Sequence, residues 1–353
     1  MNEFVRAVRL DDFDPLYEMI GSVTPGLTTL MLDRAQLLER IERSHFAFTR
    51  KSESHGGEPY VLVMEDGRTG RLIGTSTVYG KTGGYEPFYA YRVVTTTHHS
   101  PQLAIQDQRR TSLHLQRIYD GPTEIGSLFL LPEFRGSGRG RLLSLSRFAL
   151  LAQRPNRFAD RVIAEMRGQC DVQGISPFWE AVMRPFFGVD FRVADALSTV
   201  SKPFIEELIP QYPLYVNLMP ESARDVIGRV HHETEPAVKL LYEEGFLPTD
   251  MVDIFDAGPV VQCATAGIDA VRRCQKRTVV QIDEVVEGPD TIIASKHEGF
   301  CSLVAPIQIL EDASTIHISR YAASVLHVQS GESVWCLPPC PTKAGSQLNH
   351  CPR

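Results

Sequence analysis

Short apolar stretches, some of them alternating with polar residues, recur five times in the first half of the chain, and each predicts a β-strand. These predicted strands cover residues 4–10, 60–64, 72–78, 125–131 and 161–166. Between them, apolar residues recur at helical spacing, which predicts helices that begin near Asp12 and Asp33 and a third helix after residue 141. Ser176 and Pro177 open a further short helix. This order predicts an α/β (α+β) fold, in which helices flank a mixed sheet.

The second half of the chain predicts an extension and then a smaller β-rich domain. Thr234 and Gly245 bracket a predicted helix, which leads into a strand at 251–255. After a short helix at 268–274, strand-like runs follow at 278–282, 291–294, 301–309, 324–328 and 333–337. We therefore expect a larger domain at 1–258, a small β-rich domain at 259–337 and a disordered tail at 338–353. The first domain would include a polar and aromatic insertion at 80–122 and an extension at 186–258.

A glycine-rich basic turn separates the fourth predicted strand from the helix that follows it. Glycines let a backbone approach an anion closely, and the N–H groups at a helix start bind phosphate. The turn has neither the Gly-Lys-Ser/Thr ending of the Walker A loop nor the dinucleotide-binding glycine spacing. Its Arg-x-x-Gly-x-Gly spacing resembles the coenzyme A pyrophosphate loop of GNAT-like N-acyltransferases, although an ordinary basic turn is the alternative. The residues expected to bind coenzyme A here are Arg135, Gly136, Gly138, Arg139 and Gly140, with Arg141 adding charge.

Composition excludes several other classes of function. A net charge of −7 does not suggest a nucleic-acid partner, and no apolar run is long enough to cross a membrane. Seven scattered cysteines do not form a disulfide framework, so a cytoplasmic location is expected. Cys336, Cys340, His350 and Cys351 have irregular spacing, and we expect no metal site and no permanently bound cofactor.

Longer blocks make the resemblance more specific, because the chain is similar to the arginine N-succinyltransferase family from residue 5 to about residue 337. The family's blocks correspond to residues 25–30, 86–92, 127–148, 164–168, 176–180, 194–198, 226–231 and 252–259. The family usually has Gly-Arg-His where this chain has Met183-Arg184-Pro185, so Met183 and Pro185 depart from it, and residues 104–122 also look unlike the family.

The resemblance implies two substrates, succinyl-CoA and L-arginine, and two products, N2-succinyl-L-arginine and CoA. This reaction is the first step of arginine catabolism by the succinyltransferase pathway. Ornithine or another amine as acceptor, and a non-catalytic acyl-CoA-binding subunit, remain alternatives. Whether the chain forms a homo- or hetero-oligomer is also open.

His231 is the expected catalytic residue, since a neutral imidazole beside a helix start can transfer protons. The resemblance places the family's proton donor there; alone, His231 would be read as a surface residue before a cap, and His232 ranks lower. The main chain near Leu128 and Leu130 is expected to stabilise the thioester oxyanion, and the resemblance puts a succinyl-CoA contact on one of these leucines. The thioester itself would lie where the fourth and fifth strands diverge. Weaker candidates for substrate contacts are Thr28, Thr29, Arg92, His98, His99, Glu165, Arg167, Asp171 and Glu180.

Overall fold

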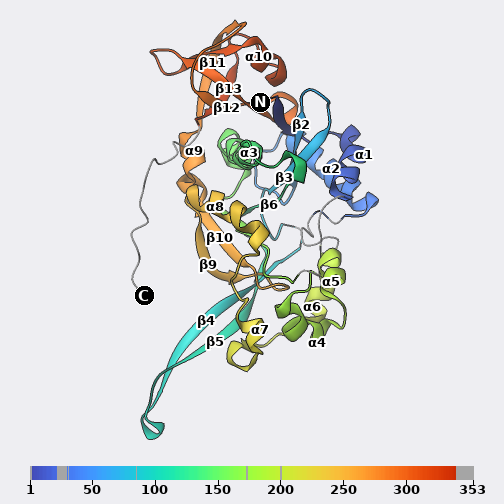
Figure 1. Ribbon diagram of the computed structural model, residues 1–353, viewed down its shortest axis with the longest axis vertical. Helices are drawn as coiled ribbons and strands as arrows, with labels where there is room; N and C mark the ends of the chain where they lie inside the picture. Colours follow the sequence, from blue (N-terminus) through green and yellow to red (C-terminus); the bar gives the residue numbers. More distant parts are fainter. Residues whose placement is uncertain are drawn as a thin grey trace.

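The structure is a computed structural model, which describes residues 2–21, 30, 32–84, 86–171, 174–198 and 201–338. Thr28 and Thr29, the tail beyond residue 338 and three of the four tail residues weighed as a zinc site lie outside the described residues. Strands from both halves of the chain join one long mixed sheet in the order β12-β15-β11-β14-β13-β1-β2-β3-β6-β7-β10-β9-β4-β5-β8. The predicted α/β fold with helices on a mixed sheet is confirmed (Figure 1).

The first half of the chain builds the centre of this sheet and the helices that cover it. Asp33 starts α2 as predicted, because its side chain accepts the Gln36 N–H at 2.9 Å while the Gln36 side chain accepts the Asp33 N–H. The elements are β1 (Glu3–Ala7), α1 (Phe13–Gly21), α2 (Arg34–Thr49), β2 (Pro59–Asp66), β3 (Leu72–Tyr79), β4 (Phe88–Ser100), β5 (Ile105–Ile118), β6 (Thr123–Leu130), α3 (Arg139–Gln153) and β7 (Arg161–Glu165).

The middle of the chain packs a second core around Trp179, which is fully buried among aromatic rings. The elements of this middle part of the chain are a π-helical turn η6 (Trp179–Met183), α4 (Arg184–Phe187), α5 (Phe191–Ser198), α6 (Pro203–Leu208), β8 (Leu214–Tyr215), α7 (Glu221–Arg224), η8 (His232–Thr234), α8 (Glu235–Glu243), β9 (Leu247–Val252) and β10 (Pro259–Ala264). The strand predicted at 251–255 is therefore displaced, since β9 ends at Val252 and a turn follows it. β10 is hydrogen-bonded to β7 and β9, so the strand directly after residue 258 lies in the central sheet.

The C-terminal β-rich part consists of α9 (Asp269–Arg273), β11 (Gln275–Asp283), β12 (Asp290–Ser295), β13 (Cys301–Ile309), β14 (Thr315–Ser319), α10 (Arg320–Leu326) and β15 (Ser333–Leu337). A further pairing of β12 with β13 closes these five strands into a ring around an apolar core. The strand predicted at 324–328 is wrong. Ser319 caps α10 there by accepting the Ala322 N–H, and His327 ends the helix in a left-handed conformation.

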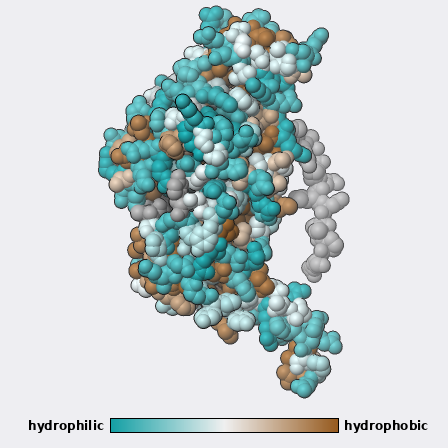
Figure 2. All heavy atoms as spheres, turned by 180° about the vertical axis from the view of Figure 1, so that it is seen from behind, coloured by the Kyte–Doolittle hydropathy of each residue, from teal (hydrophilic) through white to brown (hydrophobic). Residues whose placement is uncertain are grey.

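Residues 80–122 contain a long antiparallel hairpin of β4 and β5, which projects from the body as an arm (Figures 1 and 2). The sequence predicted only an excursion at this place. Within the outer part of the arm, threonine, histidine and arginine side chains are exposed on both faces, so no alternation of apolar and polar residues marks its strands. In the described part of the chain, no helix is both long and apolar enough to cross a membrane.

Candidate active site

The centre of the sheet opens between β6 and β7. These two strands run parallel and pair only at Thr123 with Val162 and at Glu124 with Ile163. Further along, β6 pairs with β3 alone, whereas β7 pairs with β10. The strands therefore separate at the place where the thioester was expected, beyond their only paired residues.

A β-bulge lies in β6 beside this opening. Thr75 of β3 is opposite Phe129 and Thr77 is opposite Gly126, so Ser127 and Leu128 together face one residue of β3. Ser127 has a positive φ of 51°, as the extra residue of a bulge can. Leu128 is half-buried, whereas Leu130 is buried and packs in the main core. Bulges re-aim the backbone next to active sites, which suits the predicted main-chain role of this segment.

The predicted phosphate loop follows β6 through η4 (Pro132–Phe134) and ends at the first residue of α3. Gly136 and Gly138 have φ angles of 91° and 81°, a region that residues with a Cβ rarely occupy. Among the described residues, no group accepts a hydrogen bond from the amide N–H of Gly136, Ser137, Gly138 or Gly140. The loop therefore offers several backbone donors, together with a helix start, to an anion.

The arginines of this loop differ in their contacts. Arg139 donates through Nε to Glu3 at 2.6 Å, and Arg141 forms an ion pair with Glu243 at 3.0 Å. These two side chains attach the helix start to its neighbours. Arg135 is exposed and donates only its Nε to a protein acceptor, the Leu130 carbonyl oxygen at 3.3 Å, within the described part of the chain. Arg135 is therefore the loop's most available guanidinium.

His231 is buried, with 4% of its surface exposed, and lies beside the residues that follow β7. Its backbone N–H donates to the Arg167 carbonyl oxygen at 2.8 Å, next to a β-bridge between Gly168 and Val230. Its Nδ1 accepts the Glu233 N–H at 3.2 Å, which caps η8 and leaves the proton of a neutral ring on Nε2. Burial, and then the Arg167 guanidinium, lower the pKa of His231 below its usual range. His231 therefore directly precedes a helical turn, as the sequence predicted, and burial is the first cause of its lowered pKa.

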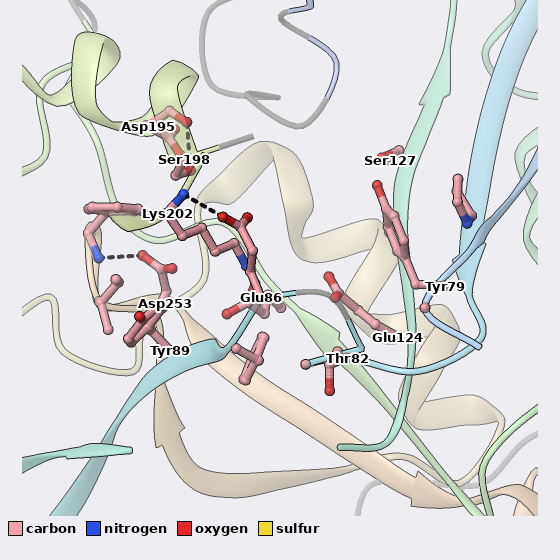
Figure 3. A pocket seen from close by; sticks show the side chains of 18 of the residues that line it. Tyr79, Thr82, Glu86, Tyr89, Glu124, Ser127, Asp195, Ser198, Lys202 and Asp253 are labelled. Carbon is pink, nitrogen blue, oxygen red and sulfur yellow. Dashed lines mark hydrogen bonds between the residues drawn. The ribbon is translucent and has the colours of Figure 1, made fainter. Parts of the chain in front are cut away.

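A cavity of about 430 Å³ lies beside the opening (Figure 3). Its walls come from β6, the segment after β7, the turn after β9, α2 and the stretch from α5 to α6. Glu124, Glu165 and Asp253 line it, and Lys202 projects from the facing segment. His231 does not line this cavity, although the neighbouring Arg167 does.

Sequence reasoning named Glu165 only weakly and missed Glu124. The only feature of the sequence that could have marked Glu124 as a site residue is its position directly before an apolar strand. Several other predicted residues have structural partners instead: Arg92 pairs with Asp250 at 3.3 Å, Glu180 pairs with Arg184, and Asp171 accepts the Ile175 N–H. His98 and His99 lie on the exposed arm.

Comparisons with known proteins agree on one family. A family model described as "Arginine N-succinyltransferase beta subunit" matches residues 3–270, and its C-terminal domain model matches residues 275–338. The chain is 38% identical over 343 residues to the arginine N-succinyltransferase subunit beta of Pseudomonas aeruginosa, covering 97% of this chain and 99% of that protein. It is 40% identical over 282 residues to an Escherichia coli arginine N-succinyltransferase, covering 79% of this chain and 80% of the relative.

A solved structure shows the same fold. The chain superimposes with a TM-score of 0.86 on the structure of arginine/ornithine succinyltransferase subunit AI from Pseudomonas aeruginosa. The two chains share 30% sequence identity, and the match covers 95% of this chain and 98% of the other.

Proposed function

The chain belongs to the arginine N-succinyltransferase family and is an acyltransferase that moves a succinyl group to arginine, and on this premise we propose how its residues divide the reaction. An acyl-CoA thioester is the co-substrate, and succinyl-CoA is the proposed one. The carbonyl carbon of the thioester forms a bond with the α-amino nitrogen of L-arginine, and the bond to sulfur breaks. The products are N2-succinyl-L-arginine and CoA, as in the first step of arginine catabolism.

The opening between β6 and β7 is the observation that carries this proposal. The phosphate loop follows β6 after the short turn η4, and the cavity lies on the same pair of strands. A CoA thioester whose pyrophosphate binds the N–H groups of Gly136, Gly138 and Gly140 therefore reaches the opening along β6. Arg135 adds a charge-assisted contact to the phosphates, whereas Arg139 contributes by holding the helix start on Glu3.

Main-chain N–H groups at the bulge beside Leu128 stabilise the oxyanion that forms when the amine attacks. Backbone donors that are already oriented need no reorganisation during the reaction, which makes such contacts effective. Leu130 is buried beyond the bulge and positions this stretch rather than touching the acyl group. Leu128 is accordingly the preferred succinyl-CoA contact of the two leucines.

His231 is the proposed donor to the departing sulfur. As the bond from carbon to sulfur breaks, the sulfur takes the bonding electron pair, and its developing negative charge accepts a hydrogen bond from the Nε2–H of the neutral ring. The proton that the amine nitrogen loses when it forms the amide ends on the sulfur, so CoA leaves as the thiol and the ring is neutral before and after the step. Because Nδ1 accepts the Glu233 N–H, the proton of the neutral ring stays on the donor nitrogen, Nε2.

Two alternatives remain. Ornithine is a second candidate acceptor, because the structure that this chain matches carries arginine and ornithine in its name. A non-catalytic acyl-CoA-binding subunit is the other alternative, since related chains are described as subunits. Oligomeric state, as homo- or hetero-oligomer, stays open. The proposed cytoplasmic location agrees with the five described cysteines, none of which is paired.

Free-thiol release tests the function directly. Purified protein is mixed with succinyl-CoA or acetyl-CoA, each with arginine, ornithine or lysine. Release with succinyl-CoA and arginine supports the proposal, and faster release with ornithine would replace the acceptor. No release with any pair, while CoA still binds, would favour the non-catalytic subunit.

A further inference from the structure

Two carboxylates on the strands that form the opening have no partner in the described part of the chain. The Oε1 atom of Glu165 is buried without a hydrogen bond. Glu124 makes no hydrogen bond or ion pair with any described residue. Both side chains line the cavity, Glu124 where β6 and β7 last pair and Glu165 at the end of β7.

Three neighbouring carboxylates in the cavity wall accept hydrogen bonds from backbone N–H groups, unlike Glu124 and Glu165. Asp256 accepts the N–H groups of Gly168 and Gly258, each at 2.7 Å. Asp253 accepts two N–H groups of its own turn, and Glu86 accepts the Lys202 N–H at 3.1 Å. Those three carboxylates hold loops in place, so they have structural roles that explain their burial.

Five basic side chains line the cavity, namely Arg40, Arg43, Lys81, Arg167 and Lys202, and Lys202 is the one whose charge acts on both glutamates. The Nζ atom of Lys202 donates to the Pro87 carbonyl oxygen at 3.4 Å and forms no ion pair with either glutamate (Figure 3 shows Lys202 and Glu124). Burial raises the pKa of both carboxyls, and the charges of Asp253 and Glu124 raise that of Glu165 further, while Lys202 opposes both shifts and Arg40 opposes that of Glu124. The ionised forms of these two carboxyls are therefore unfavourable by themselves, and a cation bound between them would stabilise both.

We infer that Glu124 and Glu165 form the subsite for the guanidinium of the arginine acceptor. This assignment rests on the proposed function and adds to it the residues that select the acceptor. A guanidinium stays protonated in proteins, and its planar fork of N–H donors matches carboxylates in a geometry that an ammonium cannot reproduce.

The position along β6 agrees with the length of the substrate. Glu124 precedes the bulge residue Leu128 by four positions, roughly 13 Å along an extended strand. An extended arginine and a glutamate side chain together span such a distance. With its guanidinium at Glu124 and Glu165, the acceptor would present its α-amino group to a thioester held at the bulge.

Kinetics with a neutral analogue test the assignment. Glu124→Gln and Glu165→Gln are compared with wild type for thiol release from succinyl-CoA with arginine, with ornithine and with citrulline, which replaces the guanidinium by an uncharged urea group. Each variant is expected to raise the KM for arginine about 10- to 100-fold, the effect of losing a charge-assisted hydrogen bond, with little change in kcat. The rate with citrulline should be unchanged or higher.

Glu39→Gln is the matched control. Glu39 also lines the cavity, but it forms an ion pair with Arg43, with 3.7 Å between Oε1 and Nη1. It should leave the KM for arginine unchanged. CoA affinity, measured in parallel, verifies that the variants are folded, and Glu165→Asp provides a second variant that keeps the charge. Unchanged arginine KM in both Gln variants, or a loss of kcat alone, would overturn the subsite. Absence of turnover in the wild type would instead overturn the proposed function.

Discussion

The backbone N–H of His231 is bonded to the carbonyl oxygen of Arg167 at 2.8 Å, although the two residues belong to different parts of the chain. Arg167 follows the end of β7 and lines the cavity, while His231 directly precedes η8. This one hydrogen bond attaches the proposed proton donor to the edge of the opening where the thioester would lie.

Replacing His231 by Gln should lower kcat about 10²- to 10⁴-fold, the usual contribution of a general acid or base. The KM for succinyl-CoA should change little, because the side chain is not part of the phosphate loop. Steady-state thiol release measures both constants. His232→Gln is the control, since the ring of His232 packs at a tilt against that of His231, with 4.3 Å between the centroids, but lacks its contacts. Equal losses in both variants would contradict the assignment.

The pH dependence of kcat should also report His231. Burial lowers the pKa of this group, so the neutral ring persists below the ordinary histidine range and protonates only at lower pH. Activity should therefore stay constant as the pH falls through about 6.5 and decline further down. In His231→Gln the residual activity should lack this decline. An unchanged profile in the variant would assign the ionisation to another group.

Replacing Gly138 by Ala should weaken CoA binding, because a Cβ would project at the loop and the left-handed backbone would be strained. Isothermal titration with CoA measures the affinity. Gly70→Ala is a matched control, since Gly70 has a similar φ of 71° and open space around it, but lies in the turn between β2 and β3. Both variants should lose about 1 to 2 kcal/mol of stability, and only the first should lose affinity. Unaltered CoA binding in Gly138→Ala would contradict the loop assignment.

Glu165→Gln should stabilise the ligand-free protein at neutral pH while weakening arginine binding. The folded state raises the pKa of Glu165, so it binds more protons than the unfolded state above the ordinary glutamate pKa. The free energy of unfolding of the wild type should accordingly fall as the pH rises from about 4.5. The variant should not show the part of this fall that comes from Glu165, because glutamine does not ionise. Melting temperatures measured from pH 4.5 to 8 should diverge with increasing pH. A variant that is less stable at pH 8 would show that Glu165 has a stabilising partner.

Replacing Asp256 by Ala should destabilise the fold by about 2 to 4 kcal/mol, since two buried N–H groups would lose their acceptor. Activity should fall too, because Gly168 bridges to Val230, the residue before His231. Chemical denaturation measures the free energy of unfolding. Asp250→Ala, which removes an exposed ion pair with Arg92, should cost less than about 1 kcal/mol. Similar costs for the two variants would show that Asp256 is not a structural acceptor.

Local patterns predicted the elements of the central sheet because each of them carries its own signal. The apolar run at 125–131, the glycines after it and the periodic leucines of α3 are adjacent in the chain, so strand, loop and helix follow from short-range preferences. The same logic failed at 324–328, where a short apolar run fits a strand or a helix equally well. There the Ser319 cap and packing against the β-rich core favour the helix.

The sequence by itself determined the fold class and the family, and it predicted the phosphate loop and the proton donor, all of which rest on residue types at fixed spacing. Only the tertiary structure decided that β4 and β5 form an arm, that Arg139 pairs with Glu3, and that Glu124 and Glu165 share one cavity wall. Each of these features depends on which distant segments come together and on which polar groups remain without a partner after burial. Those are properties of the packed chain, and no local pattern of residues carries them.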